Sequence, residues 1–157
     1  MGSRPTRLFL SASLVTAALL PACSSTPTAP SDASNAVLVL GVTPNPITAD
    51  AVPNGFQIRY TVTITETAGV GGEFEAVNSS LFDDATGVQL AINNYDAADM
   101  IVFVGSKRLE PMASVEVPKQ MAYATASGAR AALLTVSVRF KDDKGNTLNQ
   151  ALLVRVM

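Results

Sequence analysis

The sequence predicts an all-β domain, folded as a single antiparallel sandwich of about seven to nine strands. Large apolar and polar residues alternate with a period of two over residues 56–65, and the same alternation returns over residues 134–141. This pattern is typical of strands with one buried and one solvated face. Turn-forming residues separate the strand segments, and no helical segment is long enough to connect parallel strands. We therefore expect the strands to pair antiparallel.

Weaker strand patterns in six further segments complete the predicted sandwich. In chain order these are residues 37–42, 74–82, 88–92, 100–104, 113–117 and 148–156. The Asp-Asp-Lys-Gly-Asn run at residues 142–146 lies between two strand segments and predicts the tip of the final hairpin. The continuously apolar residues 100–104 predict a central strand covered on both faces, or alternatively an exposed edge strand awaiting a partner. Residues 96–100 are expected to form a turn at most.

The first 22 residues are interpreted as a cleaved signal peptide. Arg4 and Arg7 precede an apolar run at residues 8–20, and the small residue Ala22 follows it. A charged region, an apolar run and a small residue before the cleavage point are the features of such peptides. As a helix the run would span about 20 Å, which is short of the roughly 30 Å hydrocarbon core of a bilayer. We therefore do not expect it to remain as a transmembrane helix.

The residues Leu20-Pro21-Ala22-Cys23 resemble the lipobox of bacterial lipoproteins. Leu20, Ala22 and Cys23 match the motif, whereas proline is less usual at its position. The resemblance implies cleavage between Ala22 and Cys23, with a diacylglyceryl group on the Cys23 sulfur and an acylated amino terminus. It implies a cell-envelope protein held on the membrane by this lipid, and in a Gram-negative host Ser24 implies the periplasmic side of the outer membrane. The alternative is ordinary cleavage after Ala22, which would release a secreted protein with a free terminal thiol.

Residues 23–36 are predicted to form a lipidated, disordered tether. After Cys23 the segment contains only Ser, Thr, Pro, Ala, Asp and Asn. A segment without large apolar side chains cannot bury enough surface to become ordered. The folded domain is expected to occupy residues 37–157.

The segments that carry the strongest strand and turn patterns are similar to bacterial immunoglobulin-like or fibronectin-type-III-like domains of envelope lipoproteins. They are residues 55–66, the Gly69-Val70-Gly71 turn and the closing hairpin around residues 135–146. The buried tryptophan and paired cysteines of antibody-type domains are missing from the sequence. The resemblance implies an immunoglobulin-like sandwich that serves as a spacer, an adhesion module or a binding module.

Composition argues against most catalytic chemistry and against nucleic acid as a partner. The 157 residues include no histidine, no tryptophan and one cysteine, so the commonest acid–base residue and any intrachain disulfide are missing. The net charge is −2, and no basic excess offsets the repulsion of a phosphate backbone. Ser106 and Lys107 form no recognisable serine–lysine motif and are interpreted as a solvated turn. We therefore expect no enzyme activity, no catalytic residue and no cofactor.

Acidic residues in the predicted turns are the candidates for calcium binding. They form three pairs: Asp83 and Asp84, Asp96 and Asp99, and Asp142 and Asp143. None of the pairs has the spacing of an EF-hand, and aspartates in tight turns ordinarily accept hydrogen bonds from backbone amides. We therefore assign no metal site. Glu73 and Glu75 lie two residues apart on one strand face and are interpreted as solvated side chains rather than a glycosidase pair.

The function that we expect from the sequence is a non-catalytic, lipid-anchored envelope protein with a structural or protein-interaction role. Its partners would be the membrane, through the N-terminal lipid, and a second envelope protein. The alternative is a ligand-binding module that captures a carbohydrate, a peptide or calcium through its loops. A concave pocket with converging polar groups would favour ligand binding, whereas an exposed apolar edge would favour protein contacts.

Overall fold

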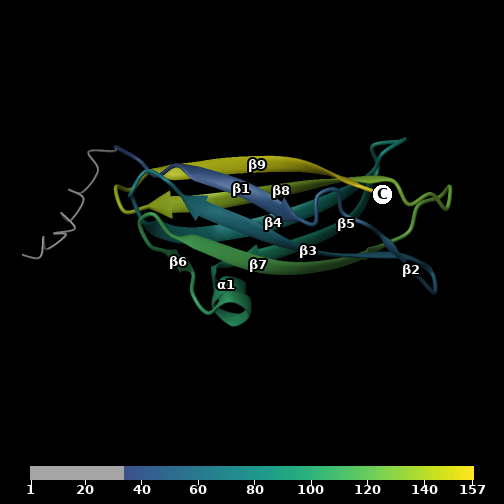
Figure 1. The fold of residues 1–157 in the computed structure, drawn as a ribbon, viewed down its shortest axis with the longest axis horizontal. Helices are drawn as coiled ribbons and strands as arrows, with labels where there is room; N and C mark the ends of the chain where they lie inside the picture. The colour runs from purple at the N-terminus through teal and green to yellow at the C-terminus, as the bar shows by residue number, and fades with distance from the viewer. Residues whose placement is uncertain (1–33) are drawn as a thin grey trace, which may run out of the picture.

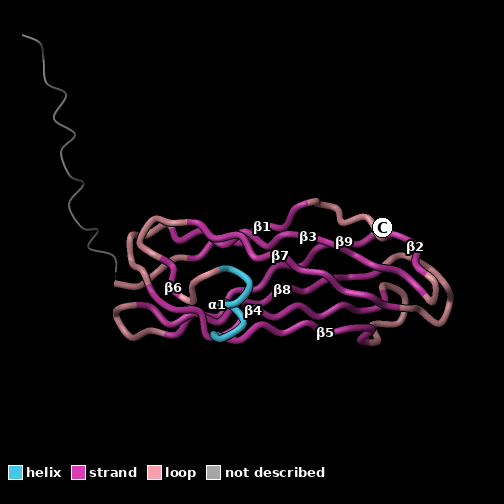
Figure 2. The backbone as a smooth tube through the Cα atoms, turned by 90° about the horizontal axis from the view of Figure 1, so that it is seen from below, coloured by secondary structure: helices cyan, strands magenta, loops and turns pink. Residues whose placement is uncertain are grey.

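The computed structural model describes residues 34–157, which form two antiparallel β-sheets packed face to face (Figures 1 and 2). Sheet A contains β1 (Leu38–Thr43), β2 (Asp50–Val52), β3 (Gly55–Glu66) and β7 (Ser114–Tyr123). Sheet B contains β4 (Gly72–Asp83), β5 (Gln89–Asp96), β6 (Arg108–Leu109), β8 (Ala132–Asp142) and β9 (Thr147–Val156). One helix, α1 (Ala97–Val104), lies between β5 and β6 along the chain. The sequence-based expectation of a mainly antiparallel β domain is confirmed.

The pairing of strands places β7 and β5 on one side of the two-layered domain. In sheet A, β3 pairs with both β1 and β2 along one edge and with β7 along the other. In sheet B the order is β5-β4-β8-β9, and the short β6 pairs with the first two residues of β4. The β8–β9 hairpin turns at residues 143–146, so the predicted tip of the final hairpin is confirmed.

The core lies between the sheets and is built by the alternating residues that the sequence places on one face. Ile58, Val62 and Ile64 of β3 are buried, as are Leu134, Val136, Val138 and Phe140 of β8. Phe74 of β4 meets Phe140 of β8 edge to face, with ring centroids 5.2 Å apart. Edge-to-face contact of this kind adds to the free energy gained by burying the rings.

The prediction of a strand at residues 100–104 is wrong, because these residues belong to α1. The Asp96 side chain accepts hydrogen bonds from the Ala98 and Asp99 N–H groups, and Asp99 completes a capping box by accepting from the Asp96 N–H. Gly105 ends the helix in the left-handed conformation, with φ of 89°. A continuous apolar run cannot distinguish a short helix from a buried strand, so the capping residues decide. For the same reason, the expectation of no more than a turn at residues 96–100 is wrong.

Two short strands and two strand ends differ from the sequence-based boundaries. β2 and β6 are missing from the prediction. β5 extends to Asp96 rather than ending at residue 92, and β7 extends to Tyr123 rather than ending at residue 117. Pro118 lies in the middle of β7, opposite Thr61 of β3. Proline is tolerated there because β7 is an edge strand, whose second row of hydrogen-bonding groups has no partner strand.

One side of the sandwich is closed by the backbone. The segment after β1 pairs with the end of β9, through hydrogen bonds from Ile47 N–H to the Arg155 carbonyl at 3.1 Å and from Met157 N–H to the Ile47 carbonyl at 2.9 Å. The Ala49 N–H donates to the Met157 carbonyl at 2.8 Å. Backbone hydrogen bonds therefore join the two sheets on this side, but the opposite side, between β5 and β7, is joined by side chains.

Glu66, at the end of β3, holds together the end of the domain at which the described chain begins. Its side chain is buried, and its carboxylate accepts hydrogen bonds from the N–H groups of Val37, Met112 and residues 68–70, at 2.8 to 3.2 Å. Burial favours the neutral acid, but the backbone N–H groups outweigh it and keep the pKa of Glu66 below its usual value. One carboxylate thus fixes three segments that are distant in the sequence.

We expect Glu66→Gln to destabilise the domain by about 2 kcal/mol or more, because the amide cannot accept all five hydrogen bonds and leaves buried donors unpaired. Since the folded-state pKa is lowered, the stabilisation is fully present above the ordinary carboxyl pKa and is lost as pH falls through the folded-state value. Urea unfolding from pH 7 down to pH 3 measures both effects. The matched control is Glu73→Gln, which removes an exposed carboxylate. Equal losses in the two variants would contradict the role given to Glu66.

Candidate functional site

The side chain of Lys119 joins the two sheets where the backbone leaves them apart. The period-two alternation of β7 directs Lys119 into the interior, where it is buried. Its Nζ donates to the Val77 carbonyl of β4 at 2.7 Å, and to the Asn93 Oδ1 and carbonyl oxygen of β5 at 2.9 and 3.3 Å. Three donors therefore meet three acceptors, which satisfies a buried ammonium.

Aromatic rings cover Lys119 on the solvent side. Its Nζ lies 3.6 Å from the centroid of the Tyr95 ring, a cation–π contact, and Tyr95 stacks on Phe103 of α1 with centroids 4.7 Å apart. Burial lowers the pKa of Lys119 to about 7, and the Asp99 carboxylate of α1 acts in the opposite direction. Because the amine is enclosed and its donors are used, we interpret Lys119 as a structural link between the sheets rather than a nucleophile.

Tyr60 fills the core next to this link. Its hydroxyl donates to the Met121 sulfur at 3.3 Å, and burial raises the pKa of Tyr60 to about 12. The neighbouring hydroxyl of Ser79 in β4 is buried without a hydrogen bond of good geometry. Because its pKa is raised, Tyr60 stays neutral at physiological pH and packs as a core residue opposite Lys119.

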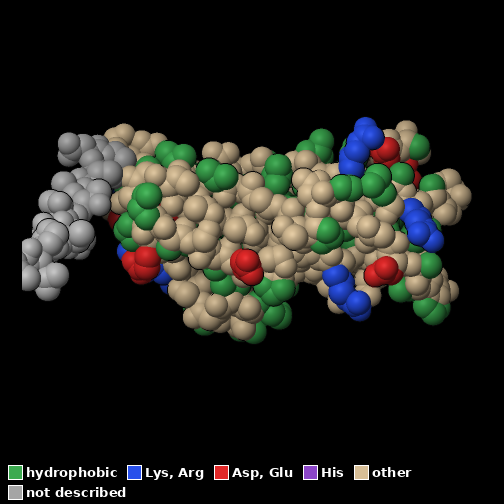
Figure 3. All heavy atoms as spheres, viewed as in Figure 1, with side chains coloured by type: hydrophobic (Ala, Val, Ile, Leu, Met, Phe, Trp, Pro, Cys, Tyr) green, Lys and Arg blue, Asp and Glu red, His purple; other side chains and the backbone are tan. Residues whose placement is uncertain are grey.

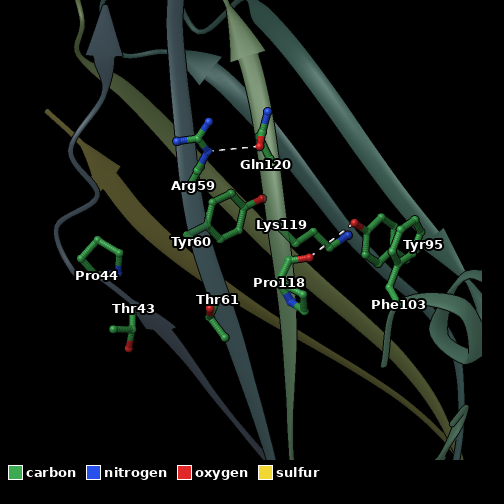
Figure 4. Close-up of a pocket in the computed structure, with 10 residues that line it drawn as sticks. All are labelled: Thr43, Pro44, Arg59, Tyr60, Thr61, Tyr95, Phe103, Pro118, Lys119 and Gln120. Atoms are coloured by element: carbon green, nitrogen blue, oxygen red, sulfur yellow. Dashed lines mark hydrogen bonds between the residues drawn. The ribbon is translucent and has the colours of Figure 1, made fainter. Parts of the chain in front are cut away.

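An open groove of about 530 Å³ lies on the outer surface of the same side (Figure 4). Its floor consists of two cross-strand pairs of β3 and β7, Arg59 with Gln120 and Thr61 with Pro118. Thr43 and Pro44 line the groove on the β1 side, and Tyr95 and Phe103 line it on the side of β5 and α1.

Arg59 is the charged side chain of the groove floor. Its Nε donates to the Gln120 Oε1 at 3.2 Å, and no carboxylate among the described residues pairs with it. Figure 3 shows one face of the domain, on which few side chains are charged and most of the surface is uncharged polar side chains or backbone. The groove can therefore offer a guanidinium to an acidic group, between apolar walls.

The helix beside the groove exposes apolar side chains. Ile101, Val102 and Phe103 are all more than half exposed, and only Met100 of α1 is fully buried. The sequence shows that residues 100–104 are apolar. Three of them are exposed because they lie on the outer side of a helix, and not because they form an edge strand.

Each aspartate pair considered for calcium contains a carboxylate bound to backbone amides. Asp83 accepts from the Ala85 and Thr86 N–H groups, and Asp96 caps α1. Asp142 accepts from the N–H groups of Lys144, Asn146 and Ala36. In residues 34–157 no three His, Cys, Asp or Glu side chains gather as a metal site would require.

The other candidate residues are placed as follows. Glu73 pairs with Lys107 at 2.7 Å, and Glu75 pairs with Arg139 at 2.6 Å, so each carboxylate has a basic neighbour. Ser106, next to Lys107, accepts from the Arg108 N–H in the turn before β6. Ala22 and Cys23, the predicted cleavage and lipidation residues, lie outside the described residues. No helix within the described part of the chain is long and apolar enough to cross a membrane.

Lys119 and Arg59 are the residues that sequence reasoning missed. Lys119 lies in the same period-two alternation as the apolar residues of β7, which are Val115, Val117, Met121 and Tyr123. This alternation would have placed the lysine on the buried face. Because the predicted strand ends before Pro118, the alternation around Lys119 was not recognised. Arg59 lies on the solvated face of the predicted strand, and the sequence alone does not show that a groove forms around it.

The described residues thus form an antiparallel β-sandwich with a side-chain link at one edge and an open groove above it. The chain matches no protein-family model, and no curated protein matches it in sequence. Solved structures with a similar fold include the following two. The Northeast Structural Genomics Consortium target SoR45 is 12% identical, with a TM-score of 0.57 over 75% of this chain and 84% of its own. The putative ApaA protein of Bordetella pertussis is 12% identical, with a TM-score of 0.54 over 76% of this chain and 93% of its own. At this identity the similarity concerns the fold alone.

We expect the link through Lys119 to make stability depend on pH in a defined direction. Its pKa is about 7 in the folded chain against an ordinary 10.5, so the unfolded chain binds more protons between these values. Stability should therefore rise as the pH increases from 7 to 9. Urea unfolding at pH 6, 7, 8 and 9 should show this rise in the natural chain and a flatter profile in Lys119→Met. The control is Lys141→Met, which removes an exposed lysine of β8. An unchanged slope in Lys119→Met would refute the explanation.

Proposed function

We propose that the chain is a non-catalytic, lipid-anchored protein of the bacterial cell envelope, whose immunoglobulin-like sandwich acts through contacts with another protein. The lipobox-like residues before Cys23 support the anchor. Two face-to-face sheets with a final β8–β9 hairpin support the immunoglobulin-like assignment. In a Gram-negative host the domain would face the periplasm from the outer membrane.

The observation that carries the interaction role is the groove on sheet A, with its unpaired Arg59 and its Tyr95–Phe103 wall. An open groove with one cationic and two aromatic contacts provides the residue types that are enriched at protein interfaces. The adjoining exposed run of α1 meets the criterion of an apolar edge, which favours protein contacts.

The alternative function is a ligand-binding module, and the groove supports it for one class of ligand, a peptide. Of the carbohydrate, peptide and calcium ligands considered, a peptide with an acidic group fits the groove best, because the groove crosses β3 and β7 between apolar walls and presents one guanidinium. The aspartates that would hold calcium are already bound to backbone amides in the described turns.

Lipid attachment at Cys23 is tested by feeding labelled palmitate to cells that make the natural chain or Cys23→Ala. We expect label in the natural chain and none in the variant, since the sulfur and the new amino terminus of Cys23 are the proposed acceptors. Cell fractionation should show the variant released from the membrane. Equal labelling of the two chains would refute the anchor.

The interaction site is tested by placing a photo-crosslinking residue at Gln120 in the groove, with Thr125 beyond the far end of β7 as the matched control. Irradiation of intact cells should give a reproducible crosslinked envelope protein from position 120, absent from position 125 and weakened by Arg59→Glu. Identical crosslinks from both positions, or none from position 120, would argue against a protein partner at the groove.

A further inference from the structure

Most of the hydrogen-bond donors of Arg59 are free to bind a ligand. Its Nε donates to the Gln120 Oε1 at 3.2 Å, and its two Nη groups have no hydrogen-bond partner within residues 34–157. The side chain is exposed on the outer face of β3. Two Nη groups form a planar fork that can bind both oxygens of one carboxylate. The contact with Gln120 holds this fork over the floor of the groove (Figure 4).

The groove is cationic, although the domain that carries it is acidic. Residues 34–157 contain nine Lys and Arg against twelve Asp and Glu, because two of the arginines and one of the aspartates precede residue 34. The side chains that line the groove include Arg59 and the enclosed Lys119 but no carboxylate. This reversal of charge favours an acidic group on the partner.

The acidic group should be a single one, because carboxylates lie on the same face of sheet A beyond the groove. Asp50 of β2 is opposite Gln57, and Glu116 of β7 is opposite Thr63. Neither forms an ion pair with Arg59. An acidic run that extended past the groove would meet these like charges, which disfavours its binding.

An apolar contact lies across β7 from the guanidinium. Pro118 is exposed on the floor of the groove, and Tyr95 and Phe103 form the wall beside it. The Tyr95 hydroxyl donates to the Pro118 carbonyl at 3.4 Å, and the Tyr95 ring contacts both the Lys119 Nζ and the Phe103 ring. The wall is therefore held in place without a ligand, which lowers the entropy lost on binding.

The distance between the guanidinium and the apolar contact selects a spacing in the ligand. Arg59 is opposite Gln120, and Pro118 is two residues further along β7, so Arg59 and Pro118 are diagonal neighbours. Such positions are about 7–8 Å apart. In an extended peptide, side chains two residues apart lie on the same side with a separation of roughly 6.5 Å. A carboxylate and an apolar side chain two residues apart can therefore reach both contacts together.

We propose that the groove binds an extended segment of the partner protein that carries one Asp or Glu and, two residues away, an aromatic or large aliphatic side chain. The Nη fork of Arg59 holds the carboxylate, and the apolar side chain packs on Pro118 against Tyr95 and Phe103. The segment crosses β3 and β7 diagonally. This inference rests on the proposed function, because it specifies what the partner presents to the groove.

The motif is tested by selecting peptides from a displayed random library on the purified protein, with both peptide ends joined to the carrier so that only side chains supply carboxylates. The natural chain should enrich a single acidic residue two positions from an apolar one, and Arg59→Gln should not. The matched control is Arg155→Gln, which removes another exposed arginine without an ion pair and should enrich the same peptides as the natural chain. Equal acidic enrichment by the natural chain and Arg59→Gln, enrichment of acidic runs, or no enrichment would overturn the proposal.

Synthetic peptides then measure the contribution of the carboxylate. One enriched sequence is made with blocked ends, once with its acidic residue and once with the matching amide. By calorimetry the natural chain should bind the acidic peptide about tenfold more tightly or better, as for a hydrogen bond between charged groups, and Arg59→Gln should bind both equally. A third peptide replaces the acidic side chain by a free C-terminal carboxylate. If this peptide bound more tightly than the acidic one, the internal segment would be refuted in favour of a chain terminus.

The outcomes separate this inference from the proposed function. A reproducible crosslink from position 120 in cells, together with equal binding of the acidic and amide peptides, would keep the groove as an interface and overturn the carboxylate motif. A crosslink that is missing in cells, together with discrimination between the peptides, would refute the envelope partner and keep the motif. Sedimentation tests a second copy as the occupant, since a dimer that is lost in Arg59→Gln would overturn the assignment to a different protein.

Discussion

The carboxylate of Glu66 is the constraint on which the end of the domain where the described chain begins depends. It is buried, yet it stays charged because backbone N–H groups from three segments converge on it. These segments are the start of β1, the crossing from β3 to β4 and the approach to β7. Because the N–H groups of Val37 and Met112 both bind this carboxylate, one interior side chain determines where these two backbone segments lie at the surface.

The two sides of the sandwich are closed by different chemistry. Backbone hydrogen bonds between residues 47–49 and the end of β9 join the sheets on one side, and side-chain identity matters little to them. On the other side the joint is Lys119, whose contacts with Val77 and Asn93 depend on one long cationic side chain. The side held by a side chain is also the side that carries α1 and the groove. The helix α1 contacts both edge strands on this side, β5 and β7, and so covers part of the edge between the sheets.

Sequence reasoning succeeded where a period of two persisted and failed where tertiary contacts decided the outcome. The alternation around Ile58 and Val138 identified the core faces of β3 and β8, because burial of one face leaves a direct trace in residue type. Residues 100–104 are all apolar, so their hydrophobicity shows no periodicity. The capping residues Asp96 and Gly105, which lie outside this run, determine that it forms a helix.

The candidate site was less predictable than the fold. Glu66 is a polar residue at a position that the alternation of β3 places on the buried face. Nothing in the neighbouring sequence indicates that backbone amides from distant segments will surround it. The groove around Arg59 requires the turn after β1 and α1, more than 50 residues apart in the sequence, to lie on opposite sides of the same stretch of sheet A. The turn aspartates, in contrast, act locally, and their roles as caps followed from residue type alone.

The entry of the chain into β1 has a mechanical consequence. β1 starts at the end of the domain where the described chain begins and runs away from it, with all six residues paired to β3. A pull on Ser34 along the strand axis therefore loads these pairs together in shear, rather than opening them one after another. The Ala36 N–H, held by Asp142 of the β8–β9 hairpin, passes part of the same load to sheet B. Unfolding by such a pull would therefore require these contacts to break together rather than in sequence.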